Sequence, residues 1–176
     1  MFTVERSEQV FAGRVFAVRR DWVRLPNGQN TALDIIAHHG AVALVPVDAQ
    51  GRIWFVRQYR HAAGKILLEL PAGTLEPGES PETCAAREIR EEIGFAARRL
   101  QRLGAFYLAP GYSTEYLHIF LATELHPAPL PQDEDEFLEP VALPIEEAFA
   151  LARGGQMEDA KTLAALLLAE PHLRPL

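Results

Sequence analysis

The sequence predicts an α/β fold, or an α+β fold, in which a mixed β-sheet is sandwiched between helices. Strand-type segments occur before and after one strongly charged helical segment, and two further helical segments follow near the C-terminus. The chain has 176 residues, 48% of them hydrophobic, which suffices for one domain with a sizeable core and a small extension.

The strands are predicted from apolar runs or alternating patterns that end at turn residues. The run "AVALVPVD" at 41–48 is typical of a buried strand, and "RIWFVRQYR" at 52–60 is expected as its hairpin partner. In chain order, the expected elements are short strands within 10–37, strands at 41–48, 52–60, 66–73, 100–110 and 115–125, a Pro- and acid-rich loop at 127–140, and helices at 145–155 and 158–170.

The charged segment predicts a helix from about Pro81 to Ile93. Ser80 is a favoured N-cap, and Pro81 suits the first helical position. Gly94 suits the position just after the helix. Apolar residues spaced four apart, starting at Ala85, form one stripe along this helix and indicate the face that meets the core.

Glu88, Glu91 and Glu92 share another face of this helix, and Arg87 can brace Glu91 four residues away. From the spacing alone, this face is either a solvated acidic surface or a site for a divalent cation. Carboxylates suit Mg²⁺, Mn²⁺ or Ca²⁺, and no histidine or cysteine partner points to zinc. We expect Cys84 to be a small core residue and not a nucleophile. The preceding Gly-rich loop "LPAGTLEPGES" can bring backbone amides close to an anion, which favours the metal-site interpretation.

Composition limits the class of partner. The net charge of −7 argues against a broad electrostatic grip on nucleic acid. The N-terminus has no signal-peptide pattern, and no apolar run approaches the length of a membrane span. The sequence contains one cysteine, so no internal disulfide can form. We expect a soluble cytoplasmic protein that binds neither nucleic acid nor membrane.

Residues 73–95 resemble the Nudix box. The pattern is Gly, five residues, Glu, seven residues, then Arg-Glu-aliphatic-x-Glu-Glu-x-Gly-apolar. It is present without a gap, at Gly73, Glu79, Arg87, Glu88, Ile89, Glu91, Glu92, Gly94 and Phe95. The resemblance covers roughly residues 40–170 and implies the Nudix fold. It also implies hydrolysis of a nucleoside diphosphate linked to another group, with one to three Mg²⁺ or Mn²⁺ ions.

The resemblance also implies roles for residues in and near the box. The metal ligands are expected to be Glu88, Glu92 and the backbone carbonyl of Ala72, with Glu91 as a ligand, a contact to bound water or a catalytic residue. Glu79 and Arg87 are expected to hold the glutamates in place.

Features outside the box are similar to the ADP-ribose diphosphatase subfamily of Nudix hydrolases. Pro110 lies fifteen residues after Phe95, and Arg60 matches an arginine that contacts substrate phosphates. The further substrate contacts expected from this resemblance are Arg57, Glu69, Gly73, Gly111 and Glu115. Glu134 matches the general base of the subfamily best, and Glu136 is its rival.

The subfamily resemblance implies a strand-rich N-terminal extension over residues 1–40, followed by a main domain over residues 41–176. The extension is expected to form a homodimer and to help shape the substrate pocket, and the C-terminal helix is expected to have only a packing role. We expect hydrolysis of ADP-ribose to AMP and ribose 5-phosphate. Two nearby alternatives are another nucleoside diphosphate sugar, such as GDP-mannose, and an RNA-end or dinucleoside polyphosphate substrate. An alternative of a different class is a non-catalytic ligand sensor, but such a protein should lose box glutamates, and none is lost here.

Overall fold

The computed structural model describes residues 1–132 and 136–174. The chain divides into two compact units. The first contains Met1–Gly40 and Phe106–Leu117, and the second contains Ala41–Ala105 and His118–Leu176. Within the described residues, no helix is long and apolar enough to span a membrane.

The first unit is built on a three-stranded antiparallel sheet in the order β1-β2-β3, comprising Thr3–Ala12, Ala17–Arg24 and Asn30–Ala37. All ten residues of β1 are exposed. The prediction placed strands only from residue 10 onward, so it missed most of β1. The turn after β8 joins this unit because Ile36 donates its N–H to the Tyr112 carbonyl at 2.8 Å, and Thr114 donates to the Ile36 carbonyl at 2.9 Å.

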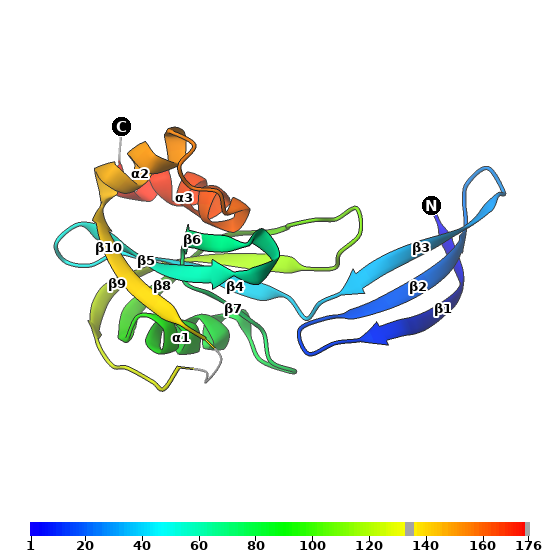
Figure 1. The fold of residues 1–176 in the computed structure, drawn as a ribbon, viewed down its shortest axis with the longest axis horizontal. Coiled ribbons are helices and arrows are strands. Elements are labelled where there is room, and N and C mark those ends of the chain that lie inside the picture. The colour runs from blue at the N-terminus through cyan, green and yellow to red at the C-terminus, as the bar shows by residue number, and fades with distance from the viewer. Residues whose placement is uncertain (133–135, 175–176) are drawn as a thin grey trace. The chain divides into compact units, whose positions relative to one another are not determined.

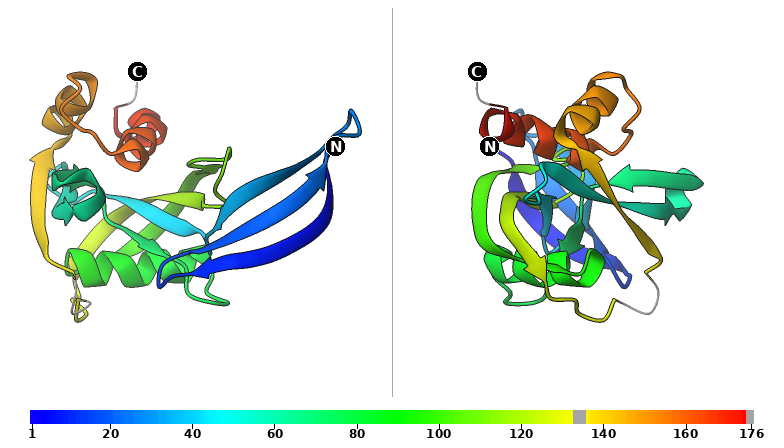
Figure 2. Two further views of the ribbon diagram at one scale, coloured as in Figure 1. Left: turned by 45° about the vertical axis from the view of Figure 1, so that its right-hand side comes forward. Right: turned by 90° about the vertical axis from the view of Figure 1, so that its left-hand side faces the viewer.

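The second unit contains two sheets with helices on both sides (Figures 1 and 2). One sheet has the order β7-β4-β9-β8 and the other β10-β5-β6. The strands are β4 Ala41–Pro46, β5 Arg52–Arg60, β6 Lys65–Glu69, β7 Ala72–Thr74, β8 Phe95–Tyr107, β9 Tyr116–Pro127 and β10 Leu138–Pro144, and the helices are η1 His61–Ala63, α1 Pro81–Glu92, α2 Ile145–Arg153 and α3 Ala160–Leu173. The mixed α/β class expected from the sequence is confirmed.

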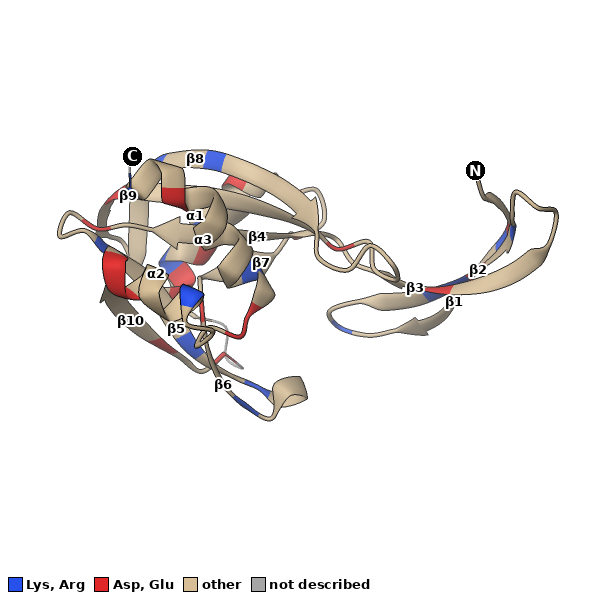
Figure 3. Cartoon of the chain, turned by 90° about the horizontal axis from the view of Figure 1, so that it is seen from above, with Lys and Arg blue, Asp and Glu red and all other residues tan. Residues whose placement is uncertain are grey.

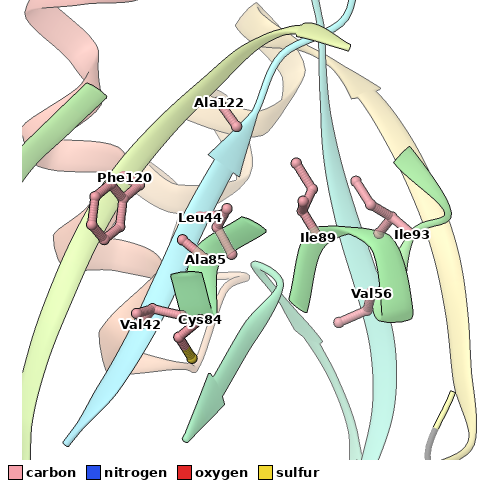
Figure 4. Packing of buried hydrophobic residues seen from close by; sticks show 9 residues of the cluster. All are labelled: Val42, Leu44, Val56, Cys84, Ala85, Ile89, Ile93, Phe120 and Ala122. Carbon is pink, nitrogen blue, oxygen red and sulfur yellow. The ribbon is translucent and has the colours of Figure 1, made fainter. Parts of the chain in front are cut away.

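Strand β4 lies at the centre of this unit. All six of its residues are buried, because α1 contacts it and so does α3. This double burial explains why the run is apolar throughout instead of alternating. Figure 4 shows side chains of α1 packed among those of the strands, in a cluster formed by Val42, Leu44, Val56, Cys84, Ala85, Ile89, Ile93, Phe120 and Ala122. Cys84 is therefore a core residue, as expected.

The expected hairpin of 41–48 with 52–60 is wrong. β5 pairs with β10 and β6. Its contacts with the 41–48 segment are an isolated bridge between Val47 and Ile53 and the hydrogen bonds of the Asp48 turn, and within the described residues it forms no ladder with β4. The reason is that both edges of β4 are already occupied, by β7 and by β9. A strand with two paired edges has no free backbone groups for a third neighbour.

The single strand expected at 66–73 is also wrong, because the chain leaves one sheet at Glu69 and enters the other at Ala72. At the break, Leu70 donates its N–H to the Thr162 hydroxyl of α3 at 2.8 Å, and the Pro71 carbonyl accepts from Leu44 at 2.9 Å. Pro71 has no N–H of its own to continue a ladder. The loop expected at 127–140 is wrong at its C-terminal end, where β10 begins at Leu138.

Candidate active site

Helix α1 is set in place by its caps and by its apolar face. The Ser80 hydroxyl accepts the Thr83 N–H at 3.2 Å, and Pro81 is the first helical residue. Gly94 has a φ of 76°, the left-handed conformation that suits a glycine just after a helix. The predicted start and end of the helix are thus confirmed. Because the apolar stripe packs against the strands, the neighbouring face directs its glutamates toward β7.

Arg87 links three carboxylates of the charged segment. Its Nε and Nη2 donate to the two oxygens of Glu79, at 3.1 and 3.0 Å. Its Nη1 donates to Glu88 at 2.7 Å and to Glu91 at 2.8 Å. The predicted bracing of Glu91 is present in the structure. Such charge-assisted bonds restrict the carboxylates to one arrangement, and they raise the pKa of Arg87, with the bonds to Glu79 contributing most.

Glu88 lies against Gly73, the first residue of the box. A Cβ at residue 73 would overlap the Glu88 carboxylate, so only glycine fits there with the glutamate in this position. Glu88 is 7% exposed. Burial raises its pKa to about 7, reinforced by the charges of Glu91 and Glu136 and opposed by Arg87.

Glu92 is the most deeply buried glutamate of the helix, at 3% exposure. Its carboxylate accepts the N–H of Ala72 at 3.1 Å, which brings it beside the backbone of β7. Burial holds the pKa of Glu92 well above its ordinary value, and the charges of Glu88 and Glu136 add to this effect. Two buried carboxylates that disfavour each other's ionised form therefore lie next to the Ala72–Gly73 backbone.

This donor set fits a divalent cation that prefers oxygen ligands. Glu88, Glu92 and the backbone at Ala72 provide such oxygens, and the repulsion between the carboxylates would be relieved by added positive charge. Across residues 1–132 and 136–174, however, no three acidic, histidine or cysteine side chains already converge on one point. One oxygen of Glu88 and one of Glu91 are bound to Arg87 instead.

Arg60 and Glu69, both predicted substrate-side residues, bind each other. Arg60 is at the end of β5 and donates from Nε and Nη2 to the two oxygens of Glu69, at 2.7 and 2.8 Å. Glu69 is 1% exposed and also pairs with Lys161. Burial raises the pKa of Glu69, but the bonds and charges of Arg60 and Lys161 outweigh it and bring the pKa below its ordinary value. The side chain of Arg57 is about half exposed and pairs with exposed Glu139.

The remaining predicted residues lie in different parts of the chain. The negative charge of Glu136 contributes to the raised pKa of both Glu88 and Glu92. Glu134 lies outside the described residues. Pro110, Gly111 and Glu115 belong to the first unit, in the turn between β8 and β9. Their contact with substrate stays a prediction.

The sequence reasoning missed Lys161, in the first turn of α3. The C-terminal helix was expected to have a packing role only, and the ion pair made by its first turn was not anticipated. Lys161 pairs with Glu69, and its positive charge acts to lower the pKa of Glu92, against the larger effect of burial. A signal was present in "EDAK", where an acidic N-cap precedes the lysine, but sequence alone does not bring residue 161 beside residue 69. Figure 3 shows acidic and basic segments intermingled on the elements of the second unit.

Comparisons with known proteins match most of this chain. The family profile described as NUDIX domain matches residues 37–166. The chain is 41% identical to an ADP-ribose pyrophosphatase of Bacillus subtilis (strain 168), over 90% of this chain and 87% of that protein. It is 36% identical to a GDP-mannose pyrophosphatase of Yersinia pestis (strain Pestoides F), over 78% and 73%.

A crystal structure of an ADP compounds hydrolase superposes with a TM-score of 0.86 at 28% identity, covering 98% of this chain and 94% of that one. The profile covers most of the chain, and it includes both the acidic helix and the glycine that its glutamate touches. This chain belongs to the Nudix family.

Proposed function

We propose that this protein hydrolyses the diphosphate of ADP-ribose to AMP and ribose 5-phosphate with the help of a divalent cation. The observation that carries the proposal is the pair of buried glutamates, Glu88 and Glu92, held against the Ala72–Gly73 backbone. The substrate is supported by the 41% identity to a protein described as an ADP-ribose pyrophosphatase. The matched solved structure is described as a hydrolase of ADP compounds.

Glu88, Glu92 and the Ala72 carbonyl would hold the cation, which we propose to be Mg²⁺ or Mn²⁺, with Glu91 nearby. When bound, the ion supplies charge neutralisation for the diphosphate and makes the attacking water more acidic. Arg87 keeps Glu88 and Glu91 in fixed orientations and is itself fixed by Glu79. Gly73 leaves room for Glu88. Arg60, whose side chain is 42% exposed while anchored to Glu69, is the proposed contact to a substrate phosphate.

The general base is proposed to be Glu134 or Glu136, both in the segment before β10. Glu136 is supported by its electrostatic effect on Glu88 and Glu92, which requires it to be near them. A carboxylate there would take the proton of the attacking water. Replacing the base by glutamine should lower kcat by about 100-fold or more and leave Mn²⁺ affinity nearly unchanged. If Glu134→Gln and Glu136→Gln both keep wild-type kcat, the base lies on the helix instead.

The substrate is tested with a panel of nucleotide sugars in Mg²⁺, with products separated by ion-exchange chromatography. Preferred release of AMP from ADP-ribose supports the proposal. Because a relative at 36% identity is described as a GDP-mannose pyrophosphatase, GDP-mannose is the main alternative, and a preference for it would replace ADP-ribose. A non-catalytic sensor would release no AMP at all, whereas an enzyme should lose its activity on Glu92→Gln.

We also propose a homodimer that forms through the first unit. Its strand β1, the residue before it and the turn after it expose large apolar side chains that a monomer would leave in water, namely Phe2, Val4, Val10, Phe11, Val15 and Phe16. Sedimentation velocity should give twice the mass of the chain, and Phe11→Asp should reduce it toward the monomer. A wild-type monomer at micromolar concentration would contradict the dimer. The single buried cysteine supports the proposed cytoplasmic location.

A further inference from the structure

Glu69 is a buried carboxylate that binds two cations. It ends β6 on the side of the sheet that faces the core, and its side chain is 1% exposed. Arg60 approaches one edge of the carboxylate with two parallel hydrogen bonds, at 2.7 and 2.8 Å. Lys161 donates from Nζ to Glu69 Oε2, one of the same two oxygens. One carboxylate is thus contacted by two cations, Arg60 and Lys161.

Lys161 is held in this position from its own helix as well. Its ammonium lies 3.0 Å from Asp159 Oδ2, and its side chain is 14% exposed. Asp159 is the N-cap of α3 and accepts the Thr162 N–H at 3.0 Å. A largely buried ammonium is costly unless it is paired. The two carboxylates therefore fix Lys161 between the start of α3 and the end of β6.

This arrangement lies next to the proposed metal ligands. Glu69 precedes Ala72 by three residues, and the Ala72 N–H binds Glu92. Between them, the Leu70 N–H is held by Thr162, the residue after Lys161. The first turn of α3 thus fixes Glu69 and Leu70, and through them the short connection to β7.

The number of cations on Glu69 decides what Arg60 can do. A guanidinium that alone balances a carboxylate forms a neutral pair, which attracts a phosphate weakly. Arg60 also feels the negative charge of Asp159. Without Lys161, the Arg60 guanidinium would face the two carboxylates of Glu69 and Asp159, whose net negative charge would oppose a phosphate. With Lys161, two cations balance two carboxylates, so the guanidinium keeps more of its attraction for another anion. The exposed part of Arg60 is available for such an anion, since 42% of its side chain is accessible.

We propose that Lys161 is a positioning residue for the substrate diphosphate, because it holds and neutralises Glu69 from the inside so that Arg60 can bind a phosphate from the outside. The proposal rests on the proposed function, and it adds a residue of the C-terminal helix to the phosphate-binding apparatus. Lys161 itself does not contact the substrate in this proposal. It acts on the substrate through Glu69 and Arg60.

The chain offers a matched control. Lys65 and Lys161 are the two lysines of the sequence. Lys65 also connects β6 to the segment before α3, through an ion pair with Glu158 at 2.6 Å, but both partners are about half exposed. Lys65→Met therefore removes the same charge, and it removes an ion pair between β6 and the segment before α3. It leaves the buried cluster intact.

The test compares Lys161→Met, Lys161→Arg and Lys65→Met with the wild type. KM and kcat for ADP-ribose are measured in Mg²⁺, Mn²⁺ affinity is measured by electron paramagnetic resonance without substrate, and Tm reports folding. Lys161→Met should raise KM about tenfold or more with a smaller change in kcat. It should leave Mn²⁺ affinity equal or tighter, because it removes a positive charge near Glu92. Lys161→Arg should restore KM to within about threefold of wild type, and Lys65→Met should match wild type.

A general loss of structure would weaken substrate and Mn²⁺ binding together, so that result would overturn the proposal. So would a KM for Lys161→Met equal to that of Lys65→Met. If Lys161→Met does not fold, Lys161→Gln keeps a hydrogen-bond donor without the charge and gives the same comparison. If the wild type leaves ADP-ribose intact, the proposed function fails. If the wild type is active and Lys161 variants match the control, only the role of Lys161 fails.

Discussion

Replacing Glu88 by glutamine should stabilise the metal-free protein at high pH. Glu88 is 7% exposed, and its folded-state pKa is about 7 against an ordinary value of 4.5. A carboxyl whose pKa is raised by folding contributes stability that is fully present below pH 4.5 and is lost as pH rises through 7. Glutamine keeps the shape and an acceptor for Arg87 but cannot ionise.

The size of the effect follows from the two pKa values. Through this one group, the wild type should lose about 2.5 kcal/mol of unfolding free energy between pH 5 and pH 8. The difference between Glu88→Gln and wild type should therefore move by about 2.5 kcal/mol in favour of the variant over the same interval. This amount is a large fraction of the stability of an ordinary domain.

The assay is urea unfolding followed by circular dichroism, in EDTA, at both pH values. Glu82→Gln is the matched control, because Glu82 is exposed on the same helix, and its difference from wild type should be nearly the same at both pH values. Adding Mg²⁺ at pH 8 should raise the Tm of wild type more than that of Glu88→Gln. A variant that is no more stable than wild type at pH 8 in EDTA would refute the reasoning, since Glu88 would then carry no burial penalty.

Three further changes test other parts of the structure. Ser80→Ala should cost about 1 kcal/mol of unfolding free energy through the lost helix cap, measured by urea unfolding, and an unchanged midpoint would contradict the cap. Gly73→Ala should weaken Mn²⁺ binding about tenfold or more in a protein with a wild-type circular dichroism spectrum, because the new Cβ displaces Glu88, and unchanged affinity would contradict that contact. Thr162→Val should cost about 1–3 kcal/mol by leaving the Leu70 N–H without its buried acceptor, and a Tm equal to wild type would show that the N–H finds another partner.

The parts of the fold that were predictable are those encoded within a few residues. Ser80 and Gly94 mark the ends of α1 because capping depends on the local backbone. The complete burial of β4 follows from its uninterrupted apolar run. For the same reason, the pairing of Arg87 with Glu91 could be predicted from a spacing of four residues on one helix.

The parts that were not predictable depend on contacts between distant segments. Several strands compete for the two edges of β4, and β7 and β9 occupy them. The local sequence of β4 does not indicate which strands these are. β10 was not predicted, because its first residues lie in the expected loop and its apolar stretch is short and flanked by Pro140 and Pro144. The meeting of Lys161 with Glu69 joins residues 92 positions apart, so only the folded chain reveals it.

The short stretch from Glu69 to Gly73, which contains the break at Leu70 and Pro71, sets the distance between the two parts of the proposed site. Its first residue anchors the arginine proposed for the phosphate, and its last two lie against the glutamates proposed for the metal. Each inserted residue would lengthen an extended chain by about 3.3–3.6 Å. The distance between the proposed phosphate-binding residues and the proposed metal ligands is thus fixed by the number of residues in this stretch. We therefore expect the stretch to tolerate substitutions far better than any insertion or deletion.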